Sequence, residues 1–294
     1  MIDVIITSYK EPESTLKCVG SFLNQDIEEK LRITVIDPFP EVEKLLKNKY
    51  KNKIDFFLDP GEGKSYALNI FLENIYSQNK DDLIIFTDGD VYVSENTVSE
   101  IVNAFKDKNV GCVTGKPVAL DSKDNIMGFW SNLVFEGIHK VRERLSEQEK
   151  FFECSGYLFG IRNGVLKGFP MEASEDGIIP YLFWKESYNI KYLPKAEVYV
   201  LNNYNYKKWL KQKIRNIKGH ENYNSLAPDM PRTKSFVNEI KQGTFFALAY
   251  PQTLKQTYWT ILLFGARLHI YLKAFYDIRI KKRKYDDGWR GSDH

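Results

Sequence analysis

Two aspartates separated by one glycine follow a strongly apolar segment of the chain. Residues 83–87 read LIIFT, a pattern typical of a buried β-strand, and Asp88, Gly89 and Asp90 come directly after it. Carboxylates at the end of such a strand can share a divalent cation. These hard oxygen ligands suit Mg²⁺ or Mn²⁺, which usually also bind phosphate oxygens of a substrate. Aspartate and glycine are equally common in solvated turns, but the apolar strand before them favours a metal site.

A glycine-rich loop with a lysine lies between a predicted strand and a predicted helix. Residues 61–65 read GEGKS. A phosphate-binding P-loop, G-x-x-x-x-G-K-[ST], would need glycine at position 58, which is Leu58 here, so a P-loop nucleotide hydrolase is disfavoured. Lys64 can still meet a diphosphate, because it lies near a helix N-terminus, where anions are favoured.

Polar residues also follow the first two predicted strands. Thr7, Ser8 and Glu11 come after the first strand, and Asp37 comes after the second. Short polar side chains at these positions could bind a base and a ribose. Taken alone, the same residues are better explained as ordinary caps and turns.

Three further residues allow two interpretations each. Glu175 and Asp176 precede a predicted helix, where the helix dipole favours acidic residues. Alternatively, this pair supplies a general base that deprotonates an acceptor hydroxyl. His220 follows a basic segment and could complete a metal site, although a surface histidine is the commoner outcome.

These side chains need a scaffold that brings the ends of several strands together. Strands that alternate with helices predict an α/β fold, in which a mostly parallel sheet has helices on both faces. Such sheets bind ligands beyond the carboxyl ends of their strands, where the candidate residues lie. The strand-like segments are residues 3–7, 33–36, 54–58, 83–87 and 110–114, and helices are expected near 13–24, 41–50, 65–77 and 94–105.

The second half of the chain is less regular. Residues 207–218 hold six basic residues and no acid. The other segments predict a strand entering a hairpin or loop over 151–162, a loop feeding a helix over 173–187, a strand over 191–201 and a loop over 222–235.

Residues 244–276 are aromatic and apolar, with lysine and arginine between. They predict either an amphipathic pair of core or oligomer helices, or a helix in the membrane interface, where the basic residues 281–284 would meet anionic lipid. No run of 18 uncharged apolar residues occurs, so no spanning helix is expected.

Composition excludes several classes of protein. The 294 residues include 42 Lys+Arg and 39 Asp+Glu, and a net charge of +3 disfavours a nucleic-acid binder driven by global charge. The three cysteines are far apart, which argues against a disulfide framework or a cysteine-rich zinc site. The first residues lack the pattern of a signal peptide and predict a strand instead. The expected location is the cytoplasm, either free or at the cytoplasmic face of the membrane.

Seven segments together resemble a known family. In chain order, TSYKE, VID, GEGKSYALN, FTDGD, FFECSG, SEDG and QKIR resemble the family 2 inverting glycosyltransferases of GT-A fold, related to cellulose and hyaluronan synthase catalytic domains. The resemblance covers about residues 2–220 and implies a GT-A domain over 1–220. Its nucleotide-binding half would be 1–115 and its acceptor half 116–220, followed by a C-terminal helical extension over 221–294.

The resemblance implies a nucleotide-sugar donor, linked to UDP or GDP, and Mg²⁺ or Mn²⁺ as cofactor. Asp90 would be the direct metal ligand, Asp88 would lie near the ribose and the metal, and His220 could complete the site. The other residues that would contact the nucleotide sugar are Thr7, Ser8, Glu11, Asp37, Lys64 and, from the Q-x-x-R element, Gln212 and Arg215.

The resemblance further implies transfer to a hydroxyl of a glycan or of a lipid-linked glycan, by one displacement that inverts the anomeric carbon. Asp176, next to Glu175, would be the base. The segment that would face the acceptor contains Cys154, Ser155 and Gly156. Peripheral membrane contact is expected, and nucleic acid is not.

One departure and two alternatives accompany this resemblance. The tryptophan that ends Q-x-x-R-W is Asn216 here, which argues against processive polymer synthesis. Within the family, the alternative is a polyprenyl-phosphate sugar synthase. A non-catalytic glycan-binding module would not need both Asp90 and Asp176.

Overall fold

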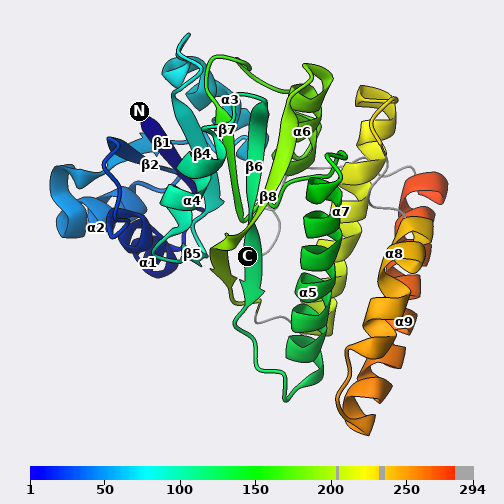
Figure 1. Cartoon of the computed structure of the whole chain (residues 1–294). Coiled ribbons are helices and arrows are strands. Elements are labelled where there is room, and N and C mark those ends of the chain that lie inside the picture. The colour runs from blue at the N-terminus through cyan, green and yellow to red at the C-terminus, as the bar shows by residue number, and fades with distance from the viewer. Residues whose placement is uncertain (203–204, 232–235, 282–294) are drawn as a thin grey trace.

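A single sheet forms the centre of the computed structural model, which describes residues 1–202, 205–231 and 236–281. Within these residues the sheet has eight strands in the order β3-β2-β1-β4-β7-β6-β8-β5 (Figure 1). The first four in this order are parallel neighbours. They are β3 (Asp55–Leu58), β2 (Leu31–Asp37), β1 (Ile2–Thr7) and β4 (Leu83–Asp88). This half confirms the predicted alternation of strands and helices.

The other half of the sheet is mixed. β7 (Leu158–Arg162) runs antiparallel between β4 and β6 (Val110–Ala119). β8 (Asn189–Val200) is parallel to β6, and the short β5 (Tyr92–Val93) pairs antiparallel with β8. The strand expected over 151–162 is therefore confined to its last five residues. Phe151, Phe152 and Cys154 are buried in a core cluster instead of continuing the ladder.

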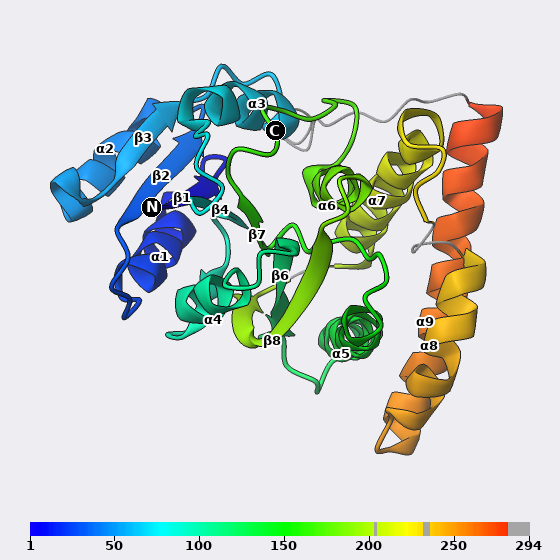
Figure 2. The same ribbon diagram turned by 45° about the horizontal axis from the view of Figure 1, so that its top comes forward.

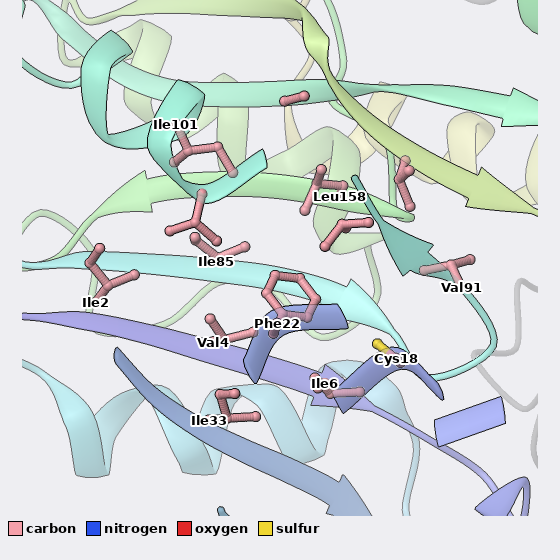
Figure 3. Packing of buried hydrophobic residues seen from close by; sticks show 14 of the residues in the cluster. Ile2, Val4, Ile6, Cys18, Phe22, Ile33, Ile85, Val91, Ile101 and Leu158 are labelled. Atoms are coloured by element: carbon pink, nitrogen blue, oxygen red, sulfur yellow. The ribbon is translucent and has the colours of Figure 1, made fainter. Parts of the chain in front are cut away.

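Helices cover both faces of the sheet and bury the central strand β1 on both sides. Val4 and Ile6 share a cluster with α1 (Pro12–Leu23), α2 (Pro40–Tyr50) and α4 (Thr97–Ala104), and Figure 3 shows them on the side where Phe22 lies. Ile5 points the opposite way, into a cluster with α3 (Lys64–Ile75) and α6 (Glu175–Lys185).

A group of long helices lies beside the sheet. It comprises α5 (Ile126–Glu147), α7 (Tyr206–Leu226), α8 (Phe236–Ala249) and α9 (Leu254–Phe275), which ends in a π-helical turn at Tyr276–Ile280. Figure 2 shows α8 and α9 side by side at the edge of the molecule. Their shared core includes Phe129 and Trp130 of α5, Trp209 of α7 and Ile270 of α9.

One expectation about this region needs correction, and one helix had no counterpart among the expected elements. Residues 222–226 are not a loop, because α7 continues to Leu226 and packs Tyr223 into the core; residues 232–235 lie outside the described part of the chain. The 22-residue helix α5 was not expected from the sequence. Among the described residues, none of the helices combines the length and apolar character needed to cross a membrane.

Candidate active site

The ends of β1 and β4 bring two of the predicted segments together. Thr7 is the register partner of Asp88, and its Oγ1 donates a hydrogen bond to Asp88 Oδ1 at 3.1 Å. The amide of Gly89 donates to the Thr7 carbonyl at 2.8 Å. A Cβ on Gly89 would lie 2.9 Å from Thr15 Oγ1 and 3.0 Å from Ser8 Cβ, so a glycine lets the turn pack against the loop after β1.

Lys64 lies between two carboxylates from distant parts of the chain. Its Nζ is 2.6 Å from Asp88 Oδ1 and 2.5 Å from Glu175 Oε1. Burial would lower the pKa of Lys64, but the carboxylates raise it well above its ordinary value, so the amine stays protonated. Burial in turn raises the pKa of Glu175, against the effect of the ammonium. The ion pairs tie the start of α3 to the end of β4 and the start of α6.

Asp176 faces a different environment from its neighbour Glu175. Ser174 Oγ donates a hydrogen bond to Asp176 Oδ1. The other oxygen, Oδ2, lies 3.7 Å from the position that a Cβ on Gly156 would take. The two adjacent acids therefore separate: Glu175 is held by Lys64, and Asp176 borders the segment predicted to face an acceptor.

Asp90 is exposed and lines the same cleft as Asp176. Desolvation by the surrounding protein, together with the Asp88 and Glu11 carboxylates, raises the pKa of Asp90 to about 7. This crowding of acidic oxygens is the donor set that a hard divalent cation prefers. Two carboxylates are enough to bind Mg²⁺ or Mn²⁺ when water and substrate phosphates supply the remaining ligands.

His220 does not join this pair. Its Nδ1 lies 3.4 Å from Glu153 Oε2. Across residues 1–202, 205–231 and 236–281, His, Cys, Asp and Glu side chains form no group of three or more that could hold a metal.

One cleft of about 1570 Å³ collects most of the predicted site residues. Asp90 and Asp176 both line it. The other predicted residues along its walls are Thr7, Ser8, Glu11, Lys64, Asp88, Ser155, Gly156, Glu175, Gln212, Arg215 and His220.

Two predicted residues lie elsewhere. Asp37 is fully buried, and its carboxylate accepts hydrogen bonds from the amides of Lys10 at 3.0 Å and Phe39 at 2.8 Å. It thereby shapes the loops around the cleft. Cys154 is also fully buried, with its side chain in a core cluster.

Three supporting residues were missed by sequence reasoning. Tyr223 OH donates to the Ser174 carbonyl at 3.0 Å, and burial raises its pKa well above the ordinary value. Arg142 Nη2 donates to the Cys154 carbonyl at 2.7 Å, and Glu153 pairs with His220 as described. Local spacing carries no signal for them, since each binds a segment distant in sequence.

Comparisons with known proteins show which family the sequence matches. The sequence profile of glycosyltransferase like family 2 matches residues 2–219. An N-acetylglucosaminyltransferase of Rhizobium meliloti (strain 1021) is 24% identical in an alignment of length 241, and the match covers 73% of this chain and 54% of that protein. The chain thus spans about half the length of this relative.

Solved structures were also compared with the whole chain. GalNAc-T7, solved with UDP, GalNAc and Mn²⁺, has a TM-score of 0.51 and 16% identity, over 85% of this chain and 57% of that one. Residues 1-349 of S. aureus TarS give 0.48 and 15%, over 92% and 80% of the two chains. The likeness to GalNAc-T7 shows a common GT-A-like fold.

Proposed function

Since the chain belongs to glycosyltransferase like family 2, we propose that this transferase works by a single inverting displacement with Asp176 as general base. The observation that supports the proposal is that Asp176 and Asp90 line one cleft together with Lys64. A sugar whose diphosphate lies near Asp90 and Lys64 would then be in the same cleft as Asp176 and the acceptor.

The proposed reaction forms one bond and breaks one. The acceptor hydroxyl oxygen attacks the anomeric carbon, and its proton passes to Asp176. The bond from the anomeric carbon to the diphosphate breaks, and its electron pair leaves with the diphosphate. Ser174 holds Oδ1 of the base, while the missing side chain of Gly156 leaves room beside Oδ2 for the acceptor.

Positive charge in the cleft would stabilise the leaving diphosphate. Lys64 stays protonated. Arg215 of α7 lines the same cleft, and its guanidinium can make a bidentate contact with two phosphate oxygens. Asp88 and Asp90 would hold Mg²⁺ or Mn²⁺, which supplies further compensation for the charge on the diphosphate.

The surface of α8 and α9 supports membrane contact. Several large apolar side chains of these two helices are exposed, including Leu254 at 91% and Phe245 at 87%. We call five of them the outer face: Phe245, Leu248, Leu254, Tyr258 and Ile261. Exposed charges within residues 254–281 are Lys255, Lys273, Arg279 and Lys281, all positive, and the one aspartate there is buried. We propose that this face lies in the interface of an anionic membrane and that the acceptor is a glycan or lipid-linked glycan.

Substitution of the base tests the mechanism. Asp176→Asn should lower turnover of the nucleotide sugar by about 10²- to 10⁴-fold, while thermal shift with donor and Mn²⁺ shows that the donor still binds. The matched control is Glu172→Gln, an exposed acid in the same loop, which should not affect turnover. NMR of the product anomer tests inversion. Near wild-type turnover by Asp176→Asn would refute the assignment.

Flotation with liposomes tests the membrane contact. The double substitution Leu254→Ser and Ile261→Ser should reduce partitioning onto phosphatidylglycerol vesicles. Partitioning equal to that of the wild type would refute the contact through the outer face.

A further inference from the structure

The cleft continues beyond the candidate catalytic residues into an apolar groove between α5, α8 and α9. Six of its wall residues are Val134, Ile138 and Val141 on one face of α5, Phe246 of α8, and Leu268 and Leu272 of α9. They belong to the same continuous cavity as Asp176 and Arg215. We call these six residues and the space between them the apolar groove. A ligand in it would be next to the site of transfer.

Two helical glycines widen the groove. Gly243 of α8 and Gly265 of α9 both line the cavity, and a Cβ at either position would meet no atom within 4 Å. Glycine weakens a helix interior relative to almost any other residue. Packing does not demand glycine at these positions, since there is room for a side chain. What the two glycines provide is open space along the groove.

The groove also reaches the surface beside the outer face. Leu268, Leu272 and Phe275 line the cavity and are 47%, 60% and 61% exposed. One cavity therefore includes both the candidate active site and exposed apolar side chains of α9. A hydrocarbon chain could extend from a membrane at the outer face into this cavity and contact these apolar side chains instead of water.

We propose that the apolar groove binds the hydrocarbon tail of a lipid-linked acceptor and so places the acceptor's polar end at Asp176. The inference deepens the proposed function and rests on it for the identity of the acceptor end. Lys213 of α7 lines the same cavity, and its ammonium suits a phosphate that joins tail to sugar.

Binding of monoalkyl phosphates tests the tail site without catalysis. Ethyl, butyl, hexyl and octyl phosphate, below their micelle concentrations, are titrated into the full chain by calorimetry. Each methylene buried in the groove should tighten binding by up to roughly fourfold. Gly243→Leu and Gly265→Leu fill the open space with a better helix former, and each should flatten this dependence on chain length.

The matched control is Leu248→Ser in α8, an exposed residue of the outer face that does not line the cavity. It should keep the chain-length dependence. A dependence that survives both glycine substitutions, or that Leu248→Ser abolishes, would overturn the groove as the tail site. So would a dimer in sedimentation that dissociates on Gly265→Leu, because a second copy would then fill the groove. Circular dichroism confirms that each variant is folded.

This test and that of the proposed function can fail separately. Asp176→Asn should leave the dependence of alkyl phosphate binding on chain length unchanged, because residue 176 is not one of the six groove residues. Loss of tail dependence in the glycine variants, together with full turnover by Asp176→Asn, would support the groove and refute the proposed base. Chain-length-independent binding in the wild type would refute the groove and leave the base to its own test.

Discussion

Lys64→Met would remove the cation that joins three separate elements around the candidate active site. The ammonium is nearly buried between Glu175, whose side chain is 7% exposed, and Asp88, which is 28% exposed. Lys64 is also the first residue of α3, where the helix dipole disfavours a cation. The carboxylates therefore compensate both for burial of the ammonium and for its place in the helix.

The expected loss follows from the charge that is left behind. Removing one partner of a buried ion pair costs about 3–5 kcal/mol, and here most of it should come from the less exposed Glu175. Glu175→Gln should cost less, because Lys64 keeps Asp88. The double substitution leaves no unpaired charge at Glu175, so its loss should fall below the sum of the two by about 1–3 kcal/mol.

Urea unfolding of the four proteins measures this coupling as a double-mutant cycle. The matched control is Lys47→Met, which breaks an exposed pair with Glu43 of the same 2.6 Å length. That pair should contribute at most about 0.5 kcal/mol. Because the pKa of Lys64 is raised, its contribution should be complete below about pH 10 and decline only above it. Strictly additive losses, or a Lys64→Met loss no larger than the control's, would refute the reasoning.

Turnover by two single variants separates the two acids. Glu175→Gln should retain most of its turnover once corrected for stability, whereas Asp176→Asn should lose about 10²- to 10⁴-fold. If Glu175→Gln abolished turnover at unchanged stability, Glu175 would be the base, and the ion pair with Lys64 would not explain its role.

Three other substitutions test single features. Gly177→Ala should lower the unfolding free energy by about 1–3 kcal/mol in urea, because its Cβ would lie 2.2 Å from Tyr223 OH; an unchanged midpoint would contradict this packing. His139, whose pKa burial lowers, accepts or donates a hydrogen bond with Tyr192 OH at 2.9 Å. Its contribution is present above about pH 6.5 and is lost as pH falls, so the stability gap between wild type and His139→Gln should narrow from pH 7.5 to 5.5 in thermal unfolding. Asp90→Ala should lower Mn²⁺-dependent turnover by about 10²-fold, measured against MnCl₂ concentration, and an unaltered metal response would exclude Asp90 as a ligand.

Much of the first half of the fold could be predicted from residue type and spacing. Apolar runs such as residues 83–87 must be buried on both faces, and the helices between them present one apolar side. The carboxyl ends of parallel strands meet at one edge, so the ends of β1 and β4 bring Thr7 beside Asp88 as expected.

Later segments followed local pattern less well. Phe151 and Phe152 have high β-propensity, but they do not form a strand; both are buried in a core cluster. Tyr223 lies in a polar stretch that suggested a loop, yet α7 continues there because its ring packs against α6.

Residue type and chain position thus determined which side chains could do chemistry and which strand ends would carry them. Tertiary packing decided which partner each of those side chains has. Glu175 pairs with Lys64, whereas Asp176 lines the cleft. Asp37 is buried, and His220 pairs with Glu153. The physical reason is that periodicity depends on neighbours a few residues apart. The partner of a charged group, in contrast, depends on distant segments that meet only when the whole core has formed.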